Sequence, residues 1–234
     1  MAKTLDRQTK TLLKEHFLLR HLPAADVERL AGYTRVRNFG ANQTVFLKGD
    51  PATGMMVVIE GRVRIASISP EGKEVVLNII NPGEVFGEIA LIDGVERTAA
   101  ATAMEETALL VMERRDFLPY LERNPELCLD LLKVMCRRIR VTSEQVEDFS
   151  FLDLKRRLAK RLVYLAAQQD EAPRPGAKAG IHFTQQELGA MTGTSRETVN
   201  KQLRAWEEEG LIHLHRGSIS VVDRKGLERV IDEE

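Results

Sequence analysis

An acidic and a basic side chain close together in one glycine-containing stretch are the first candidates for ligand chemistry in this chain. They lie in Phe86–Ala99, with the sequence FGEIALIDGVERTA. Gly87 allows the backbone to approach a ligand closely. Glu88, Ile89 and Ala90 can begin a short helical turn whose N–H groups face an anion. The stretch therefore has the composition of an anion-binding loop.

Arg97 and Thr98 complete the candidate site. A guanidinium fork beside a hydroxyl is a good pairing for a phosphate group. Glu88 can accept hydrogen bonds from sugar hydroxyls, as acidic residues do for ribose in dinucleotide-binding proteins. The alternative is a surface loop closed by an ion pair between Glu88 and Arg97.

A second candidate is a polar pair on a long predicted helix, Cys128–Phe149. Asn124 can cap the start of this helix, with Pro125 at its first position. Small or apolar residues recur with alternating spacings of four and three, as in helices that pack on a partner helix. We call them the predicted seam: Cys128, Leu132, Met135, Ile139, Thr142, Val146 and Phe149. Thr142 and the adjacent Ser143 need hydrogen-bond partners in a dry seam. The alternative is a helix packed within its own domain.

A third candidate is Phe183–Ile212, which has a helix-turn-helix layout. Gly189 allows close helix packing, Gly193 makes the turn, and Ser195 caps the second helix. Five positions are predicted core: Leu188, Met191, Val199, Leu203 and Trp206. The segment Leu211–Val222 predicts a hairpin wing with basic residues near its tip. The alternative is a small helical bundle with solvated charges.

The remaining elements must position these three stretches. Short alternating segments separated by glycine and proline turns predict a sandwich or barrel. The expected strands are Arg35–Phe39, Thr44–Lys48, Met55–Glu60, Arg62–Ser69, Glu74–Ile80, Thr98–Ala103 and Ala108–Glu113. The other expected helices are Thr11–Arg20, Ala24–Ala31, Arg115–Leu121, Leu152–Gln168, Thr184–Thr192 and Ser195–Glu209. An exposed loop is expected at Gln169–Gly180.

Composition limits the classes of function. The chain has 234 residues, 43% hydrophobic and 29% charged, with a formal net charge of −1. These values are typical of a soluble globular protein, and DNA contact must come from a local patch. No secretory signal or membrane span is present, so we expect a cytoplasmic protein without a membrane partner. Cys128 and Cys136 are too far apart for a disulfide within one helix and too few for a four-cysteine cluster; we expect structural roles. His213 and His215 are expected on the wing surface, with no metal site.

The stretch Phe86–Ala99 closely resembles the phosphate-binding cassette of the bacterial cyclic-AMP receptor protein (catabolite activator) and FNR superfamily. It is most similar to the cyclic-AMP receptor branch, and the loop between Glu88 and Arg97 is one residue shorter than in the best-known member. The resemblance implies that Glu88 holds the ribose 2′-OH and Arg97 pairs with the cyclic phosphate. Thr98 and nearby backbone, including Ala99, complete the cradle. The FNR-like redox-sensing relatives carry an N-terminal cysteine cluster, which this chain lacks.

The segment Arg137–Leu154, RRIRVTSEQVEDFSFLDL, is similar to the dimer helix and hinge of the same family. By that resemblance Thr142 and Ser143, one from each subunit, bond the adenine edge, and Arg138 approaches the ligand. A hydroxyl can donate or accept, so cyclic AMP is favoured while cyclic GMP remains an alternative.

The start of the second helix in the helix-turn-helix, SRETV, also resembles the family. The resemblance implies that Arg196 contacts guanine edges and Glu197 accepts from a cytosine amino group. Lys201 takes the third base-reading position, where the best-known member has arginine. Phosphate contacts are implied for Thr184, Gln186, Ser195 and Thr198, and His215 lies near the wing tip.

The sequence thus predicts an α+β protein, not an enzyme, that regulates transcription as a homodimer through residues 128–149. The expected parts are a cyclic-nucleotide-binding β-roll (jelly roll) with N-terminal helices at 1–123, a dimerisation helix and hinge at 124–151, and a winged helix-turn-helix at 152–234. Expected partners are cyclic AMP, a palindromic double-stranded operator and RNA polymerase. Two other classes are a DNA-binding regulator that ignores nucleotide and an enzyme. No P-loop, nucleophile elbow or metal-ligand cluster supports an enzyme.

Overall fold

A computed structural model describes residues 16, 19, 22–171 and 181–232. The chain forms two compact units, residues 1–68 with 77–140, and residues 69–76 with 141–234. We describe each by itself. The predicted helix Thr11–Arg20, apart from His16 and Leu19, lies outside the described residues, as does the predicted loop beyond residue 171. No helix in the described parts is long and apolar enough to cross a bilayer.

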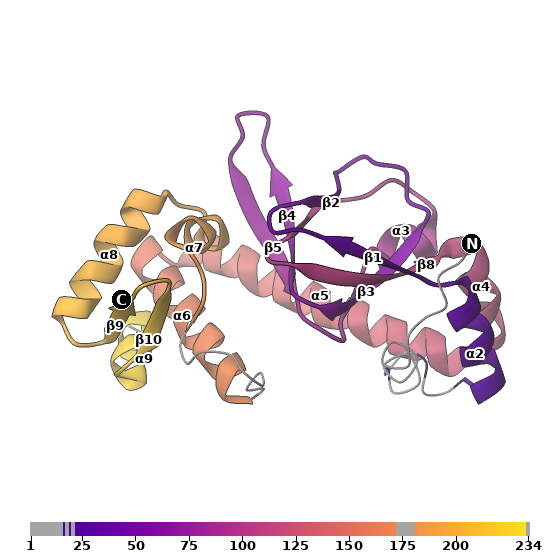
Figure 1. Cartoon of the computed structure of the whole chain (residues 1–234). Helices are drawn as coiled ribbons and strands as arrows, with labels where there is room; N and C mark the ends of the chain where they lie inside the picture. The colour runs from indigo at the N-terminus through magenta and orange to yellow at the C-terminus, as the bar shows by residue number, and fades with distance from the viewer. Residues whose placement is uncertain (1–15, 17–18, 20–21, 172–180, 233–234) are drawn as a thin grey trace. The chain divides into compact units, whose positions relative to one another are not determined.

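The first unit forms a β-roll of two four-stranded antiparallel sheets, of which only residues 74–76 at the start of one strand fall in the second unit (Figure 1). One sheet has the order β1-β8-β3-β6, formed by Arg35–Phe39, Thr107–Glu113, Gly54–Glu60 and Val85–Phe86. The other has the order β2-β7-β4-β5, formed by Thr44–Phe46, Ala100–Ala103, Val63–Ile68 and Glu74–Ile80. The predicted strands are confirmed, with every end within two residues of the observed one. The strand predicted from Thr98 begins only at Ala100, and β6 was missed because two residues show no alternation.

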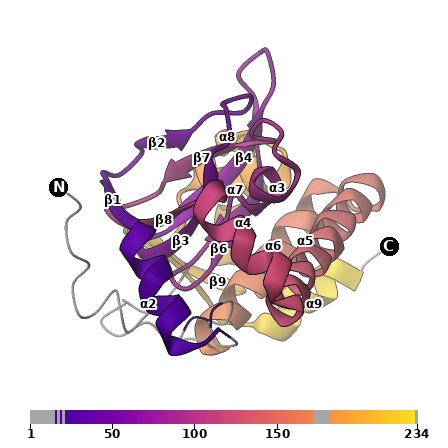
Figure 2. The same ribbon diagram turned by 90° about the vertical axis from the view of Figure 1, so that its right-hand side faces the viewer.

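Helices cover one face of the first sheet (Figure 2). They are α2 (Ala24–Tyr33), α3 (Glu88–Asp93), α4 (Arg114–Arg123) and the start of α5 (Pro125–Phe151). Their apolar faces share a core with β3 and β8 that includes Leu30, Val57, Leu110, Phe117 and Leu127. A second core lies between the two sheets, around Phe39, Val58, Phe86 and Leu109. The sheet pairing and these two cores fix where the loops between strands can place polar groups.

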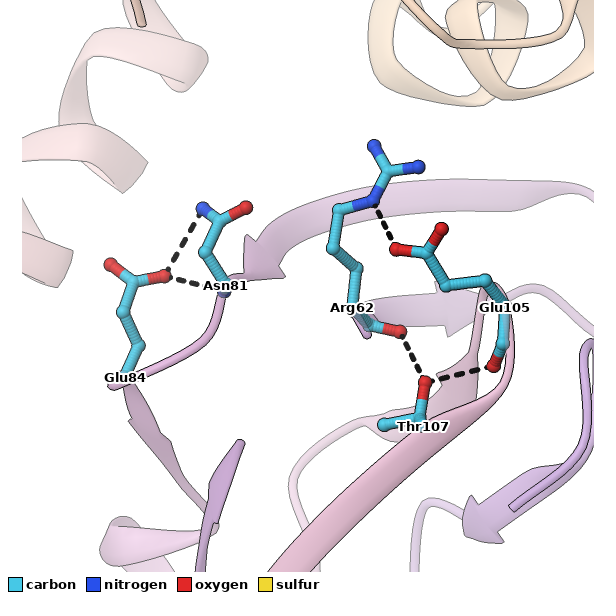
Figure 3. A network of polar contacts seen from close by, with 5 residues as sticks. All are labelled: Arg62, Asn81, Glu84, Glu105 and Thr107. Carbon is cyan, nitrogen blue, oxygen red and sulfur yellow. Dashed lines mark hydrogen bonds and ion pairs between the residues drawn. The ribbon is translucent and has the colours of Figure 1, made fainter. Parts of the chain in front are cut away.

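A polar network holds the turn that leads into the candidate site (Figure 3). The Glu84 carboxylate accepts from the Asn81 backbone nitrogen at 2.7 Å and from its side-chain amide at 3.3 Å. Val58 on β3 donates to the Glu84 carbonyl oxygen at 3.0 Å. In the same view, Arg62 Nε donates to Glu105 at 2.8 Å, and Thr107 Oγ1 donates to the Glu105 carbonyl oxygen at 2.8 Å. The chain therefore enters β6, and the site that follows it, from a closed turn.

One face of α5 packs against the core of the β-roll unit. Leu127 and Leu131 are buried in the core under the sheet. Cys128 packs against this core, and its Sγ donates to the Leu121 carbonyl oxygen at 3.1 Å. The prediction that Cys128 lies on the seam is therefore wrong, because an unbroken spacing cannot show which stripe of a helix faces its own domain. Asn124 directly precedes the helix, and its side-chain amide donates to the Tyr120 carbonyl oxygen at 2.8 Å.

The second unit contains the end of α5 and a winged helix-turn-helix. Its helices are α6 (Leu154–Glu171), α7 (Gln185–Thr192), α8 (Arg196–Glu208) and α9 (Arg224–Asp232). The wing is the antiparallel pair β9 (Ile212–His215) and β10 (Ser218–Val221). All five predicted core residues are buried, and Trp206 is the largest fully buried side chain of the unit. The helix α6 runs three residues beyond its predicted end, so the expected loop does not begin at Gln169. The helix α9 was not predicted.

Candidate ligand and nucleic-acid sites

The loop after β6 brings Glu88 and Arg97 together in the interior of the β-roll. Glu88 is the first residue of α3, and its side chain is 1% exposed. Arg97 is 5% exposed. Two charged groups are almost never buried to this extent without partners. The groups that contact Glu88 and Arg97 therefore show whether the loop is built to bind an anion or is closed by an ion pair between the two residues.

Arg97 is oriented by backbone carbonyls and one aromatic ring. Its Nη1 donates to the Gly87 carbonyl oxygen at 3.0 Å and its Nη2 to the Gly54 carbonyl oxygen at 2.7 Å. The guanidinium carbon lies 4.3 Å from the ring centroid of Phe46, a cation–π distance. Burial lowers the pKa of Arg97, and the nearby carboxylates of Glu88 and Asp50 act in the opposite direction. Arginine remains charged under these conditions, so the loop holds a desolvated, positioned cation.

Gly87 makes this arrangement possible. Its φ of 76° is left-handed, a conformation that residues with a side chain rarely adopt. A Cβ at this position would lie 2.5 Å from Arg97 Nη1. The glycine therefore provides both the turn into α3 and the space in which the guanidinium lies.

Glu88 is held from the long helix. Arg138 on α5 donates through Nη1 to Glu88 Oε1 and through Nη2 to the carbonyl oxygen of Val85. Arg138 thus connects α5 to both ends of the β6–α3 connection. The structure places it on Glu88, an arrangement that the sequence did not indicate.

Hydrogen bonding around the two buried charges is incomplete. Within the described protein atoms, Glu88 Oε2 and Arg97 Nε are buried and have no hydrogen-bond partner. A buried unsatisfied group of this kind costs about 1–3 kcal/mol, more when it is charged. Of the other predicted residues of this loop, Ile89 and Thr98 are exposed, whereas Ala90 and Ala99 are buried. An unsatisfied carboxylate acceptor and an unsatisfied guanidinium donor suit a ligand with hydroxyl and phosphate groups.

Two further site residues were missed from the sequence. Phe46 and Gly54 lie about 50 and 40 residues before Arg97, and only the pairing of β2 with β7 and of β3 with β8 brings them near it. An isolated sequence carries no spacing signal for such contacts. Arg114 is a third supporting residue, since its Nε donates to the Leu91 carbonyl oxygen of α3 at 2.7 Å.

Thr142 and Ser143 lie on α5 and are both exposed. Phe149 and Phe151 are exposed in the last turn of the helix. Before that turn, the exposed large apolar residues are Leu129, Leu132, Ile139 and Val146, with exposed fractions of 55%, 56%, 65% and 59%. Together with exposed Cys136, they follow the three-four spacing that continues through Ser143. We call these six positions the α5 stripe. The α5 stripe therefore shares Leu132, Ile139 and Val146 with the predicted seam. Its polar residue is Ser143, whereas the prediction placed the adjacent Thr142 there.

The recognition helix α8 presents its polar residues from a well-capped start. Ser195 accepts at Oγ from the Thr198 backbone nitrogen at 3.2 Å, as an N-cap residue does. Arg196, Glu197 and Lys201 are exposed on the helix. Hydrogen bonds to its own backbone N–H and to Ser195, with the nearby Arg196, lower the pKa of Glu197, so its carboxylate is charged near neutral pH. These side chains are free to meet base edges.

The predicted DNA contacts outside α8 and its N-cap lie at the start of α7 and on the wing. Thr184 caps α7 in a reciprocal capping box with Glu187. Gln186 is exposed on α7, and His215 is exposed on the wing, where its Nε2 lies 3.1 Å from Ser220 Oγ. His213 lies beside Glu207 at 3.4 Å. No group of three potential metal ligands occurs in the parts of the chain that the structure describes.

A run of basic residues on α6 has a different role. Arg156 Nε donates to the Ile231 carbonyl oxygen of α9 at 2.8 Å, and Lys160 pairs with Asp148 at 2.5 Å. Arg161 Nε lies 3.3 Å from Met191 Sδ, and burial lowers its pKa. This run therefore stabilises the unit through contacts within it.

Comparisons with known proteins identify a domain around each of the two candidate sites. The model of the cyclic nucleotide-binding domain matches residues 36–124, and the model of the Crp-like helix-turn-helix domain matches residues 156–230. A CRP-like cAMP-activated global transcriptional regulator of Mycobacterium tuberculosis is 35% identical over 193 residues, 82% of this chain and 86% of the relative. The cyclic AMP receptor protein of Thermus thermophilus is 32% identical over 213 residues, 91% of this chain and 95% of the relative.

Solved structures give the same result. The c-di-GMP responsive regulator CLP of Xanthomonas campestris has a TM-score of 0.73 at 25% identity, covering 85% of this chain and 99% of that one. A CRP/FNR-family regulator of Thermus thermophilus has a TM-score of 0.68 at 29% identity, with the same coverage. The fold and sites define a DNA-binding transcription regulator with a cyclic nucleotide-binding domain. The chain belongs to the CRP family of bacterial transcription regulators.

Proposed function

We propose that this protein is a homodimeric regulator whose affinity for a palindromic operator is raised by cyclic AMP. The observation that carries the proposal is the buried pair of Glu88 and Arg97, each with an unsatisfied polar atom, across the left-handed Gly87. An allosteric ligand that supplies a phosphate and a hydroxyl satisfies both groups. Arg97 would hold the cyclic phosphate and Glu88 the ribose 2′-OH.

Backbone and side chains beside this pair complete the proposed ligand site. Thr98 and the backbone from Ile89, Ala90 and Ala99 surround the phosphate. We propose that Arg138 acts on the ligand through Glu88, which it already holds. The ligand carries no reactive chemistry here; it supplies charge and hydrogen bonds that the β-roll lacks without it. Catalysis is not part of the proposed function.

The α5 stripe supports the proposed dimer. Four large aliphatic residues more than half exposed, at coiled-coil spacing, form an apolar surface of a kind that marks an interaction site. We propose that two copies pair along this stripe. This keeps the dimer interface predicted for residues 128–149, except that Cys128 packs against the core of its own unit. Thr142 and Ser143 would then reach the base from the two subunits. Ligand would favour one dimer geometry, which places two α8 helices in successive major grooves.

DNA recognition follows from the exposed start of α8. We propose that Arg196 and Glu197 read bases, with Lys201 at a third base position. Contacts to phosphate would come from Thr184, Gln186, Ser195, Thr198 and His215. RNA polymerase is a further proposed partner, and the protein would act in the cytoplasm.

We propose cyclic AMP as the nucleotide that this protein binds. Relatives named cAMP-activated at 32–35% identity favour cyclic AMP. The hydroxyls of Thr142 and Ser143 suit adenine and guanine alike. The CLP regulator of Xanthomonas campestris is c-di-GMP responsive, which makes cyclic di-GMP a further candidate ligand.

Calorimetric titration with the three nucleotides tests the ligand assignment. We expect cyclic AMP to bind the full-length protein at least tenfold more tightly than cyclic GMP or cyclic di-GMP. Tighter binding of cyclic di-GMP would transfer the assignment to that nucleotide. Binding of none of the three would support a regulator that ignores nucleotide.

A further inference from the structure

The boundary between α5 and α6 looks like a hinge in the sequence and in the backbone. The helix α5 ends at Phe151 and α6 begins at Leu154, which leaves a two-residue break. A short break between two helices normally permits rotation, and the resemblance to the family also implies a hinge there. The side chains around the break show a different arrangement, and all of them belong to the second compact unit.

Arg157 on α6 connects three segments across this break. Its Nη1 donates to the carbonyl oxygen of Leu152 at 2.6 Å. Its Nε donates to the carbonyl oxygen of Thr192, the last residue of α7, at 3.2 Å. The guanidinium carbon also lies 5.2 Å from the ring centroid of Phe149 on α5. One cation therefore contacts the end of α5, the break itself and the end of α7.

Phe149 makes the second connection. A Cβ at Gly193 would lie 2.7 Å from Phe149 Cε1 and 3.4 Å from Cζ. Gly193 is the left-handed residue that ends α7, with φ of 71°, and Ser195, two residues later, caps α8. The phenyl ring thus takes the space that a side chain would need in the turn before the recognition helix.

We propose that Arg157 is a positioning residue that locks the turn before the recognition helix to the last turn of α5. We call the residues Phe149, Leu152, Arg157, Thr192 and Gly193 the α5–α7 joint. Because the joint bridges the break, the end of α5 and the recognition helix move as one body. The movement that follows ligand binding is then carried by α5 before Asp148 and not by rotation at Leu152–Asp153. The inference rests on the proposed function, since it concerns how ligand binding reaches α8.

The contacts argue against a DNA-phosphate role for Arg157. Two of its nitrogens donate to backbone carbonyls, and its flat face lies against an aromatic ring. A side-on phosphate contact through Nε and Nη2 would need Nε to leave the Thr192 carbonyl oxygen at the end of α7. The adjacent Arg156 provides a matched comparison, because it carries the same charge and donates to Ile231 in α9.

The experiment compares full-length wild type with Arg157→Gln, Arg157→Lys and Arg156→Gln. Calorimetry gives the affinity for cyclic AMP. Fluorescence anisotropy gives the affinity for a DNA site selected with the wild-type protein, with and without saturating cyclic AMP. Hydrogen exchange in the absence of nucleotide and DNA gives the opening of the backbone around Leu152.

We expect Arg157→Gln to bind cyclic AMP within about twofold of wild type and to lose about tenfold or more of the nucleotide-induced gain in DNA affinity, within the usual size of allosteric coupling. Amides at Leu152 and in the turn before α8 should exchange faster. Arg156→Gln should keep the gain and the slow exchange. Arg157→Lys should recover part of the gain, because an ammonium group can bind one carbonyl but cannot form the planar fork.

Full nucleotide response and wild-type exchange in Arg157→Gln would overturn the proposal. Equal losses in Arg156→Gln and Arg157→Gln would also overturn it, since they would reflect charge alone. A wild type without any nucleotide-induced gain would instead contradict the proposed function. In that case the α5–α7 joint is tested by comparing Arg157→Gln with wild type in hydrogen exchange at Leu152 and in DNA affinity without nucleotide.

Discussion

Arg97 shows how one residue can be prepared for an anion before the anion binds. Two backbone carbonyls and the Phe46 ring fix its guanidinium plane, while Nε stays without a partner among the described protein atoms. Fixing the plane in advance lowers the entropy lost on binding. The free energy of binding a phosphate should therefore depend strongly on this side chain.

Replacing Arg97 with leucine should abolish most nucleotide binding. Loss of charge-assisted hydrogen bonds worth about 1.5–3 kcal/mol each predicts at least a hundredfold weaker binding by calorimetry. Arg37→Leu is the matched control, because Arg37 also lies over a phenylalanine ring in the β-roll but is exposed. Equal losses in both variants would assign the effect to general charge and not to this site.

Arg196 at the start of α8 and Thr184 at the start of α7 should separate base reading from phosphate binding. Arg196→Ala should cost about 1–3 kcal/mol at its cognate base pair and relax specificity there. Thr184→Ala should weaken binding to all DNA sequences alike. Competition binding with site variants measures both, and uniform weakening in Arg196→Ala would make it a phosphate contact instead.

At the scale of elements, α5 packs inward through Leu127 and Leu131 and exposes the α5 stripe on another face. We expect Ile139→Asp to convert the dimer to a monomer, because a charge in a dry helix pair lacks a partner. Arg140→Asp, at the next exposed position, changes charge outside the stripe and should leave the dimer intact. Light scattering coupled to size exclusion measures both, and a dimeric Ile139→Asp protein would place the interface elsewhere.

Most elements could be predicted because their signals are local. Alternation located the long strands of the β-roll, and the Ser195 cap located α8. The capping box of Thr184 and Glu187 at α7 was seen only in the structure. The elements that were missed have weak local signals: β6 has two residues, and α9 begins immediately after the wing. The paired ends of the binding loop, Glu88 and Arg97, were also readable because they lie close in sequence. Their supports, Phe46, Gly54 and the Arg138 link to Glu88, come from distant strands and another helix, so only the fold reveals them.

At the scale of the whole molecule, the N-terminal segment contributes a pH-dependent contact. His16 is 5% exposed, and its Nε2 lies 2.9 Å from the Gly83 carbonyl oxygen, in the turn before β6. Burial lowers the pKa of His16 below its ordinary value, and the hydrogen bond to Gly83 opposes this only in part. The unfolded chain therefore binds more protons than the folded chain as the pH falls below about 6.5, so stability decreases there.

The His16→Gln variant tests this contact. Glutamine keeps a donor for Gly83 but does not titrate, so the variant should lose less stability between pH 7.5 and 5.5 than wild type. Urea unfolding at each pH gives the free energies of unfolding, with His215→Gln as the exposed control. Identical pH dependence of wild type and His16→Gln would contradict the assigned role of His16.

The two units of the chain must communicate if ligand is to control DNA binding. Thermodynamic linkage requires that cyclic AMP raise DNA affinity by the same factor by which DNA raises cyclic AMP affinity. A regulator with two independent sites would show neither effect. The factor is therefore a direct measure of the proposed function.

The decisive measurement is the affinity of the full-length protein for cyclic AMP with and without a saturating selected DNA site. We predict that DNA tightens cyclic AMP binding by about 5–150-fold, matched by an equal gain in DNA affinity with nucleotide present. Cyclic AMP affinity that is the same with and without DNA would contradict the account.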